Sequence, residues 1–422
     1  MPVRRPIVAL ASLAALAAVL AACTVAPMST DAAPSPSAAT PTPSAASARV
    51  SVSPAGLDQD LRDAAWADDV PRATALVAQG ADVNAKDDTQ QSAYLVATSE
   101  GHLDLLRMTL AHGASVDDKD SWNGTGLIRA AERGHGYIIG ALLQAGIDRD
   151  HVNRIGYQAI HEAVWFGKDD QDYATTIRAL IAGGVEFTRA SVRERLTPLQ
   201  MAEQRGLRGS AKILRAAQDA PRPADPDAAL LAAAESGDAD AAAIAIRAGA
   251  DLEVRDRQLQ RTPLMHAVMQ DRVAVAQLLV AMGADVNALD YRKDTPWLMT
   301  GVTGSVAMLD ALLPGRPDLS IPNRYGGTSV HPAAERGHVD YIARVVTAGV
   351  DLNEVNSLGW TALQEAVLLG DGGPAHQEIV RILVAHGADP GIRDRNGRTA
   401  LDNARAKGYD AIARILEGAT PR

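Results

Sequence analysis

The segment Ala-Ala-Glu-Arg-Gly-His occupies residues 130–135 and is found again, letter for letter, at residues 333–338. The paired alanines allow close helix packing, and the glycine can adopt a positive φ and turn the chain. Aligned on this glycine, the same pattern recurs in steps of 31 to 39 residues, most often 33. The aligned positions are Asp68, Gly101, Gly134, Gly167, Gly206, Gly237, Asp271, Gly304, Gly337, Gly370 and Gly408. A fixed period of this size is typical of a repeat architecture.

Each repeat carries signals for two helices and a turn. Thr-Pro-Leu at residues 197–199 and 262–264 suits a helix start, because threonine caps the N-terminus and proline needs no N–H there. After the glycine, the leucines Leu103, Leu105, Leu106 and Leu110 give the second helix one apolar face. Gly-Ala-Asp, as at residues 80–82, then predicts a hairpin finger. Since no repeat buries its own apolar face, neighbouring repeats must stack into a solenoid.

Thr-Pro-Leu, Gly-His and Gly-Ala-Asp at a period of 33 together resemble the ankyrin repeat. The resemblance covers roughly residues 57–418 and implies an all-α repeat solenoid of about eleven helix-turn-helix units with hairpin fingers. It also implies that partners are bound on the concave face, by the fingertips and the exposed ends of the inner helices. One departure, Leu-Leu-Pro-Gly-Arg-Pro at residues 312–317, predicts a distorted hairpin.

A second level of order divides the repeats into two blocks. Residues 123–215 match residues 326–418 at an offset of 203, and both blocks carry an insertion between two helices, at 168–173 and 371–377. We infer duplication of a five-repeat block, with one additional repeat in the second copy. The blocks are residues 57–220 and 221–418, with prolines at the junction. The repeat step across the junction is close to a full period, which favours one continuous stack.

The N-terminus has the features of an export signal. Arg4 and Arg5 precede an apolar run at residues 7–20, which is too short to span a bilayer and long enough for a signal peptide. The run ends in Leu-Ala-Ala-Cys at residues 20–23, which resembles the bacterial lipobox. The resemblance implies that residues 1–22 are removed and that Cys23 is lipidated. An ordinary secretory peptide and an uncleaved anchor are the alternatives.

Residues 23–56 are rich in proline, serine, alanine and threonine, and such a segment predicts a disordered tether. A tether after a lipidated cysteine would hold the repeats at a membrane surface. We therefore expect a lipid anchor in the cell membrane or the outer membrane, with the repeats facing the periplasm or the exterior.

Composition disfavours several function classes. The net charge of −10 disfavours nucleic-acid binding, and a single cysteine excludes an intrachain disulfide or a thiolate zinc site. His161-Glu162 begins like a zinc-protease helix, but Trp165 stands where the second histidine is required. His161 and His331 occupy the ankyrin histidine position, which implies bonds to backbone groups between repeats. We expect no enzyme activity, no cofactor, no metal and a monomer.

Large aromatic side chains are the candidate partner-binding residues, because aromatics in a groove form the hot spots of interfaces. Mapped onto the repeat, eight of them fall on fingertips or inner-helix ends: Trp66, Trp122, Tyr157, Trp165, Phe166, Tyr291, Tyr325 and Trp360. For Trp165 and Phe166, internal packing is an equally supported alternative. Glu132-Arg133 and Glu335-Arg336 occupy the same helix-end positions as charged pairs.

These observations predict a non-enzymatic scaffold that binds another extracytoplasmic protein, for example a secreted enzyme that it inhibits or escorts. The membrane is contacted through the N-terminal lipid only. An envelope glycan-binding module is the alternative, with rings stacked on sugars, and an extracytoplasmic enzyme is a remote one.

Overall fold

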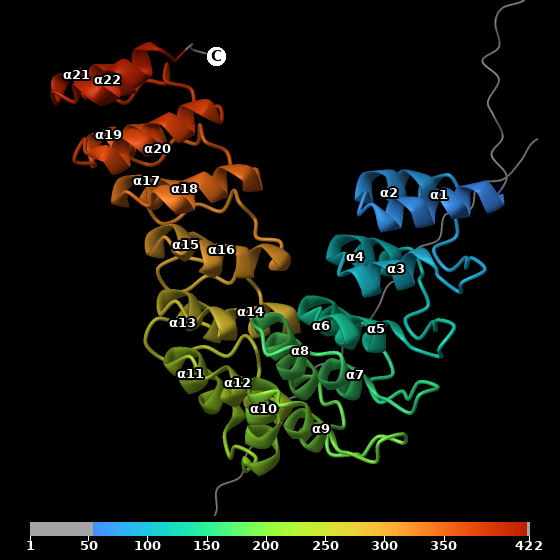
Figure 1. Cartoon of the computed structure of the whole chain (residues 1–422). Helices are drawn as coiled ribbons and strands as arrows, with labels where there is room; N and C mark the ends of the chain where they lie inside the picture. Colours follow the sequence, from blue (N-terminus) through green and yellow to red (C-terminus); the bar gives the residue numbers. More distant parts are fainter. Residues whose placement is uncertain (1–53, 420–422) are drawn as a thin grey trace, which may run out of the picture. The chain divides into compact units, whose positions relative to one another are not determined.

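Eleven helix pairs follow one another along residues 54–419, the part of the chain that the computed structural model describes (Figure 1). Within this part the only β pairing is one isolated bridge between Lys119 and Thr125. The prediction of an all-α solenoid of about eleven repeats is confirmed. Cys23 and nearly all of the predicted tether lie outside the described residues.

In each pair the first helix is the inner one and the second is the outer one. The inner helices are α1 (Pro54–Trp66), α3 (Ala93–Glu100), α5 (Gly126–Arg133), α7 (Ala159–Trp165), α9 (Pro198–Arg205), α11 (Pro226–Ser236), α13 (Pro263–Met269), α15 (Pro296–Thr303), α17 (Val330–Arg336), α19 (Ala362–Leu368) and α21 (Ala400–Ala406). The outer helices are α2 (Val70–Ala78), α4 (Leu103–Ala111), α6 (Gly136–Gln144), α8 (Gln171–Ala182), α10 (Arg208–Asp219), α12 (Ala239–Arg247), α14 (Val273–Met282), α16 (Val306–Leu312), α18 (Val339–Val345), α20 (Pro374–Ala385) and α22 (Asp410–Glu417). Two 3-10 turns, η1 (Leu313–Gly315) and η2 (Val346–Ala348), follow α16 and α18.

The inner helices begin and end at the residues that the repeat pattern predicts. Thr262 caps α13 by accepting a hydrogen bond from the backbone N–H of Met265, and Thr361 forms a reciprocal capping box on α19. The turn after the inner helix is left-handed at Gly134, with φ of 80°. Asp271 takes the same conformation, with φ of 52°, where the sequence lacks glycine.

The glycines before the two insertions have a different role. Gly167 is not in the left-handed region, but a Cβ there would lie 2.1 Å from the carbonyl oxygen of Ala163. Gly370 makes an equivalent approach to Ala366, at 2.2 Å. In both copies the insertion forms a short loop and then the first turn of a 12-residue outer helix, α8 or α20. The insertions therefore lengthen an outer helix as well as a loop.

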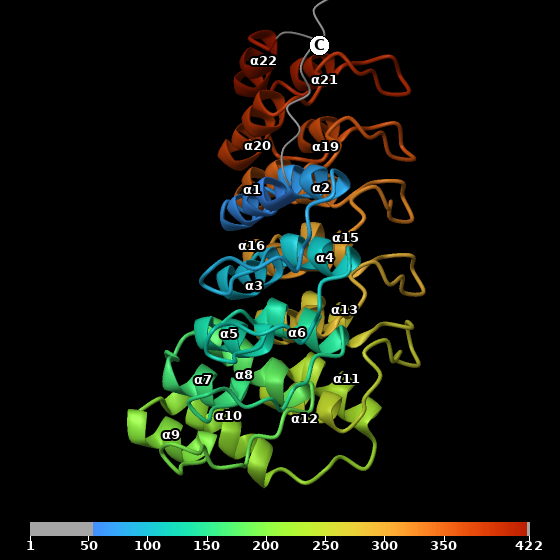
Figure 2. The same cartoon turned by 90° about the vertical axis from the view of Figure 1, so that its right-hand side faces the viewer.

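An aspartate or asparagine side chain organises most fingers at the start of the tip, whereas Ser191 holds this position in the finger between α8 and α9. In the second repeat boundary, Asp120 accepts hydrogen bonds from the backbone N–H groups of Trp122 and Gly124, both at 2.8 Å. Adjacent fingers are also joined, since the backbone N–H of Ser357 donates to the carbonyl oxygen of Tyr325 at 2.8 Å. Figure 2 shows the fingers of the second block projecting in a row from the inner helices.

The stack of inner helices is interrupted at the junction of the two blocks. Consecutive inner helices pack on one another from α1 to α9 and again from α11 to α21, but α9 does not pack on α11 in this way. Instead the outer helices α6 and α8 of the first block pack on α12 and α14 of the second (Figure 1). At this junction the two blocks meet through their outer helices, α10 on α12 included, and one continuous stack stays a prediction.

The departure at residues 312–317 lies in this contact. Residues 313–315 form η1, and Arg316 has φ of 55°. Arg107 of α4 donates to the carbonyl oxygen of Pro314 at 2.7 Å, and Arg316 lies 2.7 Å from the carboxylate of Asp104. The distorted turn thus contacts the outer helix α4 of the first block.

Alanine, leucine, valine and isoleucine fill most of the core, and the largest fully buried side chain is that of Trp297. Among residues 54–419, none of the helices combines the length and the apolarity that crossing a membrane requires.

Candidate functional site

A cleft of 430 Å³ lies on the concave side of the second block, between the fingers and the inner helices α13 to α19. Its apolar lining includes Met269, Met299, Leu358 and Leu369. Tyr325, on a fingertip, borders it with more than half of its side chain exposed. The cleft thus has apolar side chains in its lining and an exposed tyrosine at its rim. It lies on the face that the sequence predicts for partner binding.

The finger wall of the cleft is held by an arginine. Nη1 of Arg324 lies 2.7 Å from Oδ2 of Asp294, and its guanidinium group lies over the ring of Tyr325, 4.6 Å from the centroid. Burial raises the pKa of Asp294, and the charge of Arg324 opposes that rise. The ion pair and the ring contact together fix Tyr325 at the mouth of the cleft.

The helix wall carries two carboxylates. Glu365 of α19 is only 7 % exposed, and its Oε1 accepts a hydrogen bond from Nδ2 of Asn356 at 2.6 Å. Burial, and then the charge of Glu335 on α17, raise the pKa of Glu365 to about 7. Glu335 itself is exposed at the helix end. The wall therefore places one buried and one exposed carboxyl group on the same side of the cleft.

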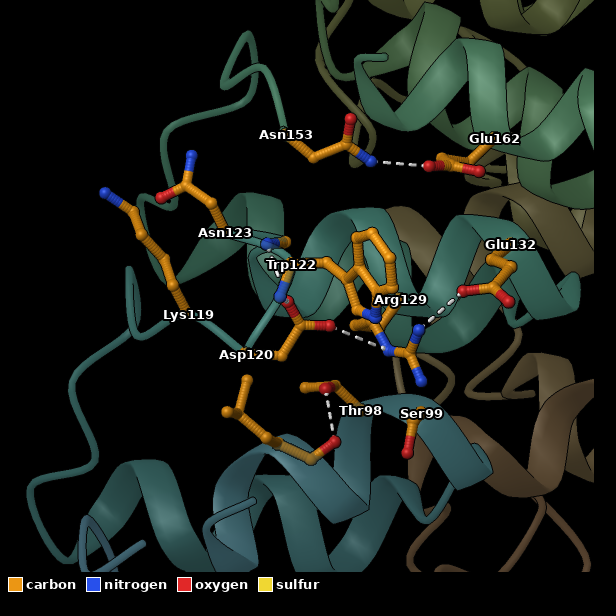
Figure 3. A network of polar contacts seen from close by, with 12 residues as sticks. Thr98, Ser99, Lys119, Asp120, Trp122, Asn123, Arg129, Glu132, Asn153 and Glu162 are labelled. Carbon is orange, nitrogen blue, oxygen red and sulfur yellow. Dashed lines mark hydrogen bonds and ion pairs between the residues drawn. The ribbon is translucent and has the colours of Figure 1, made fainter. Parts of the chain in front are cut away.

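The first block contains a second copy of this wall (Figure 3). Glu162 accepts a hydrogen bond from Asn153 at 2.6 Å, as Glu365 does from Asn356. Burial likewise raises the pKa of Glu162 to about 7, with the Asn153 bond opposing and Glu132 adding to the rise. Here an arginine is present as well, since Nη1 of Arg129 donates to Glu132 at 2.8 Å.

Residues of the two insertions form hydrogen bonds to the inner helices that carry the wall glutamates. The hydroxyl of Tyr173 donates to the carbonyl oxygen of Glu132 at 2.8 Å. Nε2 of His376, the residue at the same place in the second copy, lies 3.0 Å from the carbonyl oxygen of Glu335. Both insertions therefore fix the end of an inner helix that carries a wall glutamate.

The structure distributes the eight predicted aromatics over exposed and internal positions. Five are exposed: Trp66, Trp122, Phe166, Tyr291 and Tyr325. Two are partly buried: Trp165 and Trp360. Only Tyr325 lines the 430 Å³ cleft, and Trp122 and Tyr325 lie in different blocks. The predicted residues therefore do not form one continuous surface, and partner contact by the exposed ones stays a prediction.

Tyr157 is a correction, because its side chain is 1 % exposed and cannot meet a partner. Its ring lies 5.9 Å from the rings of both Trp165 and His161. Arg205 lies over Trp165, 5.5 Å from the centroid. Trp165 thus follows the internal-packing alternative, whereas its neighbour Phe166 is exposed.

The histidines of the inner helices are structural. Nδ1 of His161 accepts from the backbone N–H of Gln158, and Nε2 lies 3.1 Å from the carbonyl oxygen of Arg189 in the next finger. Nδ1 of His331 accepts in the same way from Thr328. In residues 54–419, histidine, cysteine, aspartate and glutamate are nowhere grouped in threes so as to hold a metal ion.

The buried glutamates are the feature that sequence reasoning missed. In each block the glutamate follows its asparagine partner by nine residues, at 153 and 162 and again at 356 and 365. This shared spacing across the duplication was the available signal.

A sequence profile described as ankyrin repeats (3 copies) matches residues 61–153, 200–290 and 298–394, more than half of the chain. The chain belongs to the ankyrin repeat family. The ankyrin repeat protein YahD of Escherichia coli K12 is 36 % identical over 187 residues, which are 44 % of this chain and 92 % of YahD. The human ankyrin repeat and SOCS box protein 16 is 31 % identical over 194 residues, 45 % of this chain and 42 % of that protein. A solved ankyrin repeat domain from Acinetobacter baumannii AYE is 40 % identical and covers 45 % of this chain and 96 % of its own, with a TM-score of 0.44.

Ankyrin repeats generally act as non-catalytic modules that bind other proteins. Family membership therefore supports a protein–protein interaction scaffold as the broad function of this ankyrin chain.

Proposed function

We propose that this ankyrin protein is a non-enzymatic scaffold, anchored by lipid on Cys23 outside the cytoplasm, which binds a partner protein through its concave face. The 430 Å³ cleft of the second block, with Tyr325 exposed at its mouth, carries the proposal. Buried aromatics at the centre of an interface commonly contribute about 2 kcal/mol or more each.

The cleft is preformed, which favours tight binding. The fingers on either side of Tyr325 are fixed by backbone hydrogen bonds such as that from Ser357, and Arg324 fixes the ring from one face. A rigid surface loses little conformational entropy when a partner docks. The mechanism is therefore presentation of fixed anchors rather than closure around a substrate.

The partner can be sought with the full-length protein, cross-linked in its own cells and purified from solubilised membranes. Tyr325→Ala and Tyr291→Ala remove exposed rings from neighbouring fingers of the second block. Val192→Ala is the matched control, because Val192 is an exposed apolar residue on a finger of the first block. We expect one discrete co-purifying protein, lost with the tyrosine variants and kept with the control. Equal recovery from all three would contradict the proposal.

The lipid anchor has its own test. The sequence at residues 20–23 supports it, and Cys23→Ala removes the only sulfur that a lipid could be attached to in the chain. We expect the unchanged protein to partition into the detergent phase of a Triton X-114 extract and the variant to leave that phase. Identical partitioning would refute lipidation and leave the partner-binding proposal standing.

Glycan binding is separated by a further variant, Trp122→Ala. Exposed rings such as those of Trp122 and Tyr291 could stack on sugars as well as on a protein. Retention of the purified chain on cell-wall material, lost with Trp122→Ala, would replace the protein partner by an envelope glycan.

A further inference from the structure

The two blocks carry the same acidic wall, but only the first supplies its own cation. The guanidinium group of Arg129 lies between two carboxylates, 2.8 Å from Oε2 of Glu132 and 3.4 Å from Oδ2 of Asp120 (Figure 3). The offset of 203 brings Glu132 onto Glu335 and Glu162 onto Glu365, whereas Arg129 falls on Pro332 and Asp120 on Asn323. The second wall therefore lacks the guanidinium group and one of the two carboxylates that the group contacts in the first wall, but it keeps both glutamates.

The carboxylates of the second wall face the open cleft. Glu365 is more than nine-tenths buried and lines the cleft; Asn356 satisfies its Oε1, and its other oxygen has no hydrogen-bond partner among the described residues. The carboxylate of Glu335 lines the same cleft and is likewise without a hydrogen bond or ion pair in residues 54–419. A largely buried carboxylate such as that of Glu365 is unfavourable without a compensating charge, and a cation bound between it and the exposed Glu335 would relieve this.

Arginines of the cleft itself do not fill the position. Four of them line it: Arg261, Arg292, Arg324 and Arg336. Arg324 is paired with Asp294 at 2.7 Å, and Arg261 with Asp290 at 3.5 Å. The other two are exposed at the rim. Across residues 54–419, none of the four forms an ion pair with Glu335 or Glu365.

We propose that the cleft binds an arginine side chain of the partner protein, with its guanidinium group at Glu335, the counterpart of the Glu132 that Arg129 binds, and at the neighbouring Glu365. Guanidinium is the cation favoured here because its planar N–H groups can serve two carboxylates at once. The inference rests on the proposed function, since it names the anchor that a protein partner inserts.

The binding step can be measured without the partner. The full chain is labelled with ¹³C-methyl methionine, because Met269 and Met299 line the cleft and report on its occupancy. The probe is N-acetyl-arginine amide, and N-acetyl-citrulline amide is its uncharged counterpart. We expect the two methyl signals to shift with the arginine probe and not with citrulline. Glu335→Gln or Glu365→Gln should weaken the probe's affinity by about tenfold, the loss typical of one charged hydrogen bond.

Two further variants make the test specific. Glu132→Gln changes the matching glutamate in the first block and should leave probe binding in the second unchanged. Pro332→Arg restores the missing guanidinium group, so it should shift the two methionine signals by itself and prevent probe binding. Undiminished probe binding by Pro332→Arg, equal binding of citrulline, or binding of N-acetyl-aspartate amide instead would overturn the inference.

Failure of this inference is distinguishable from failure of the proposed function. A chain that captures a partner through Tyr325 but does not bind the arginine probe would refute only the arginine anchor. A chain that binds the probe as predicted but captures no partner protein would refute the scaffold function and keep the site.

Discussion

Gly140 approaches Ala281 so closely that a Cβ at residue 140 would lie 1.8 Å from the Ala281 carbonyl oxygen. Gly140 lies within α6 of the first block, and Ala281 lies within α14 of the second. Gln144, one turn further along α6, donates to the same carbonyl at 3.2 Å. The contact explains a glycine inside a helix, where it is unfavourable by about 1 kcal/mol relative to alanine.

Gly140→Ala should therefore destabilise the contact between the blocks. The added methyl group forces α6 and α14 apart, and we expect a net loss of about 1–3 kcal/mol despite the better helix propensity. Urea denaturation followed by circular dichroism measures the loss, and small-angle X-ray scattering should show a larger radius of gyration. Gly418→Ala is the control, because its Cβ would meet the nearest atom at an ordinary 3.6 Å. Unchanged scattering for Gly140→Ala would contradict the close approach.

The ion pairs between the blocks should differ in strength. Arg316 and Asp104 are more than half exposed, so Asp104→Ala should change stability by less than about 1 kcal/mol. Arg178 and Asp240 are nearly buried at 2.8 Å, so Arg178→Ala leaves Asp240 uncompensated and should cost about 3 kcal/mol. Urea midpoints of the single and double variants measure both couplings. Equal losses would show that burial does not decide between the two pairs.

The wall glutamates should make stability fall as the pH rises. The pKa of Glu365 is about 7 in the folded chain, above its ordinary 4.5, so between these values the folded chain binds more protons than the unfolded chain. Its contribution is therefore most favourable below pH 4.5 and is lost as the pH rises through 7. Glu365→Gln keeps an acceptor for Asn356 and removes the charge. It should be more stable than the unchanged chain at pH 8, by about 1–3 kcal/mol, and equal to it at pH 4. The same difference in the free energy of unfolding between the variant and the unchanged chain at pH 4 and at pH 8 would contradict this.

The left-handed turn that follows each inner helix gives a prediction about backbone strain. Asp271 has φ of 52°, a conformation that glycine adopts without steric cost, so Asp271→Gly should raise stability by about 0.5–1 kcal/mol. Gly206 has φ of 74° and open space around it, so Gly206→Asp should lower stability by a similar amount. Thermal denaturation of the pair checks both signs. A loss of stability in Asp271→Gly would mean that the aspartate side chain matters more than the turn.

The helix pairs could be predicted from the sequence because each repeat contains its own capping and turn residues. A glycine or aspartate that turns the chain and a threonine that caps a helix act within a few residues, so their spacing predicts the helix pairs directly. The back-to-back contact could not be predicted in this way. It depends on Gly140 meeting Ala281, and nothing local to either residue indicates the other. The unusual turn at residues 312–317 could be predicted from the sequence, but the ion pair between Arg316 and Asp104 could not.

The site was predicted in part. The position of Tyr325 and of Glu335-Arg336 on the concave face followed from the repeat register. Tyr157 was misplaced because its fingertip position says nothing about the neighbouring Trp165 that covers it. Glu365 is buried because neighbouring repeats pack around it. Its residue type alone predicts an exposed side chain, since glutamate is rarely buried.

The central claim, that the cleft of the second block faces a partner protein, is tested most directly by photo-crosslinking in intact cells. A benzophenone amino acid replaces Tyr325 at the mouth of the cleft, and replaces Val192 on the first block as the control. The account predicts one cross-linked protein from position 325, attached through a segment that contains arginine, and none of that protein from position 192. Cross-links from position 325 only to the chain itself, or the same products from both positions, would contradict it.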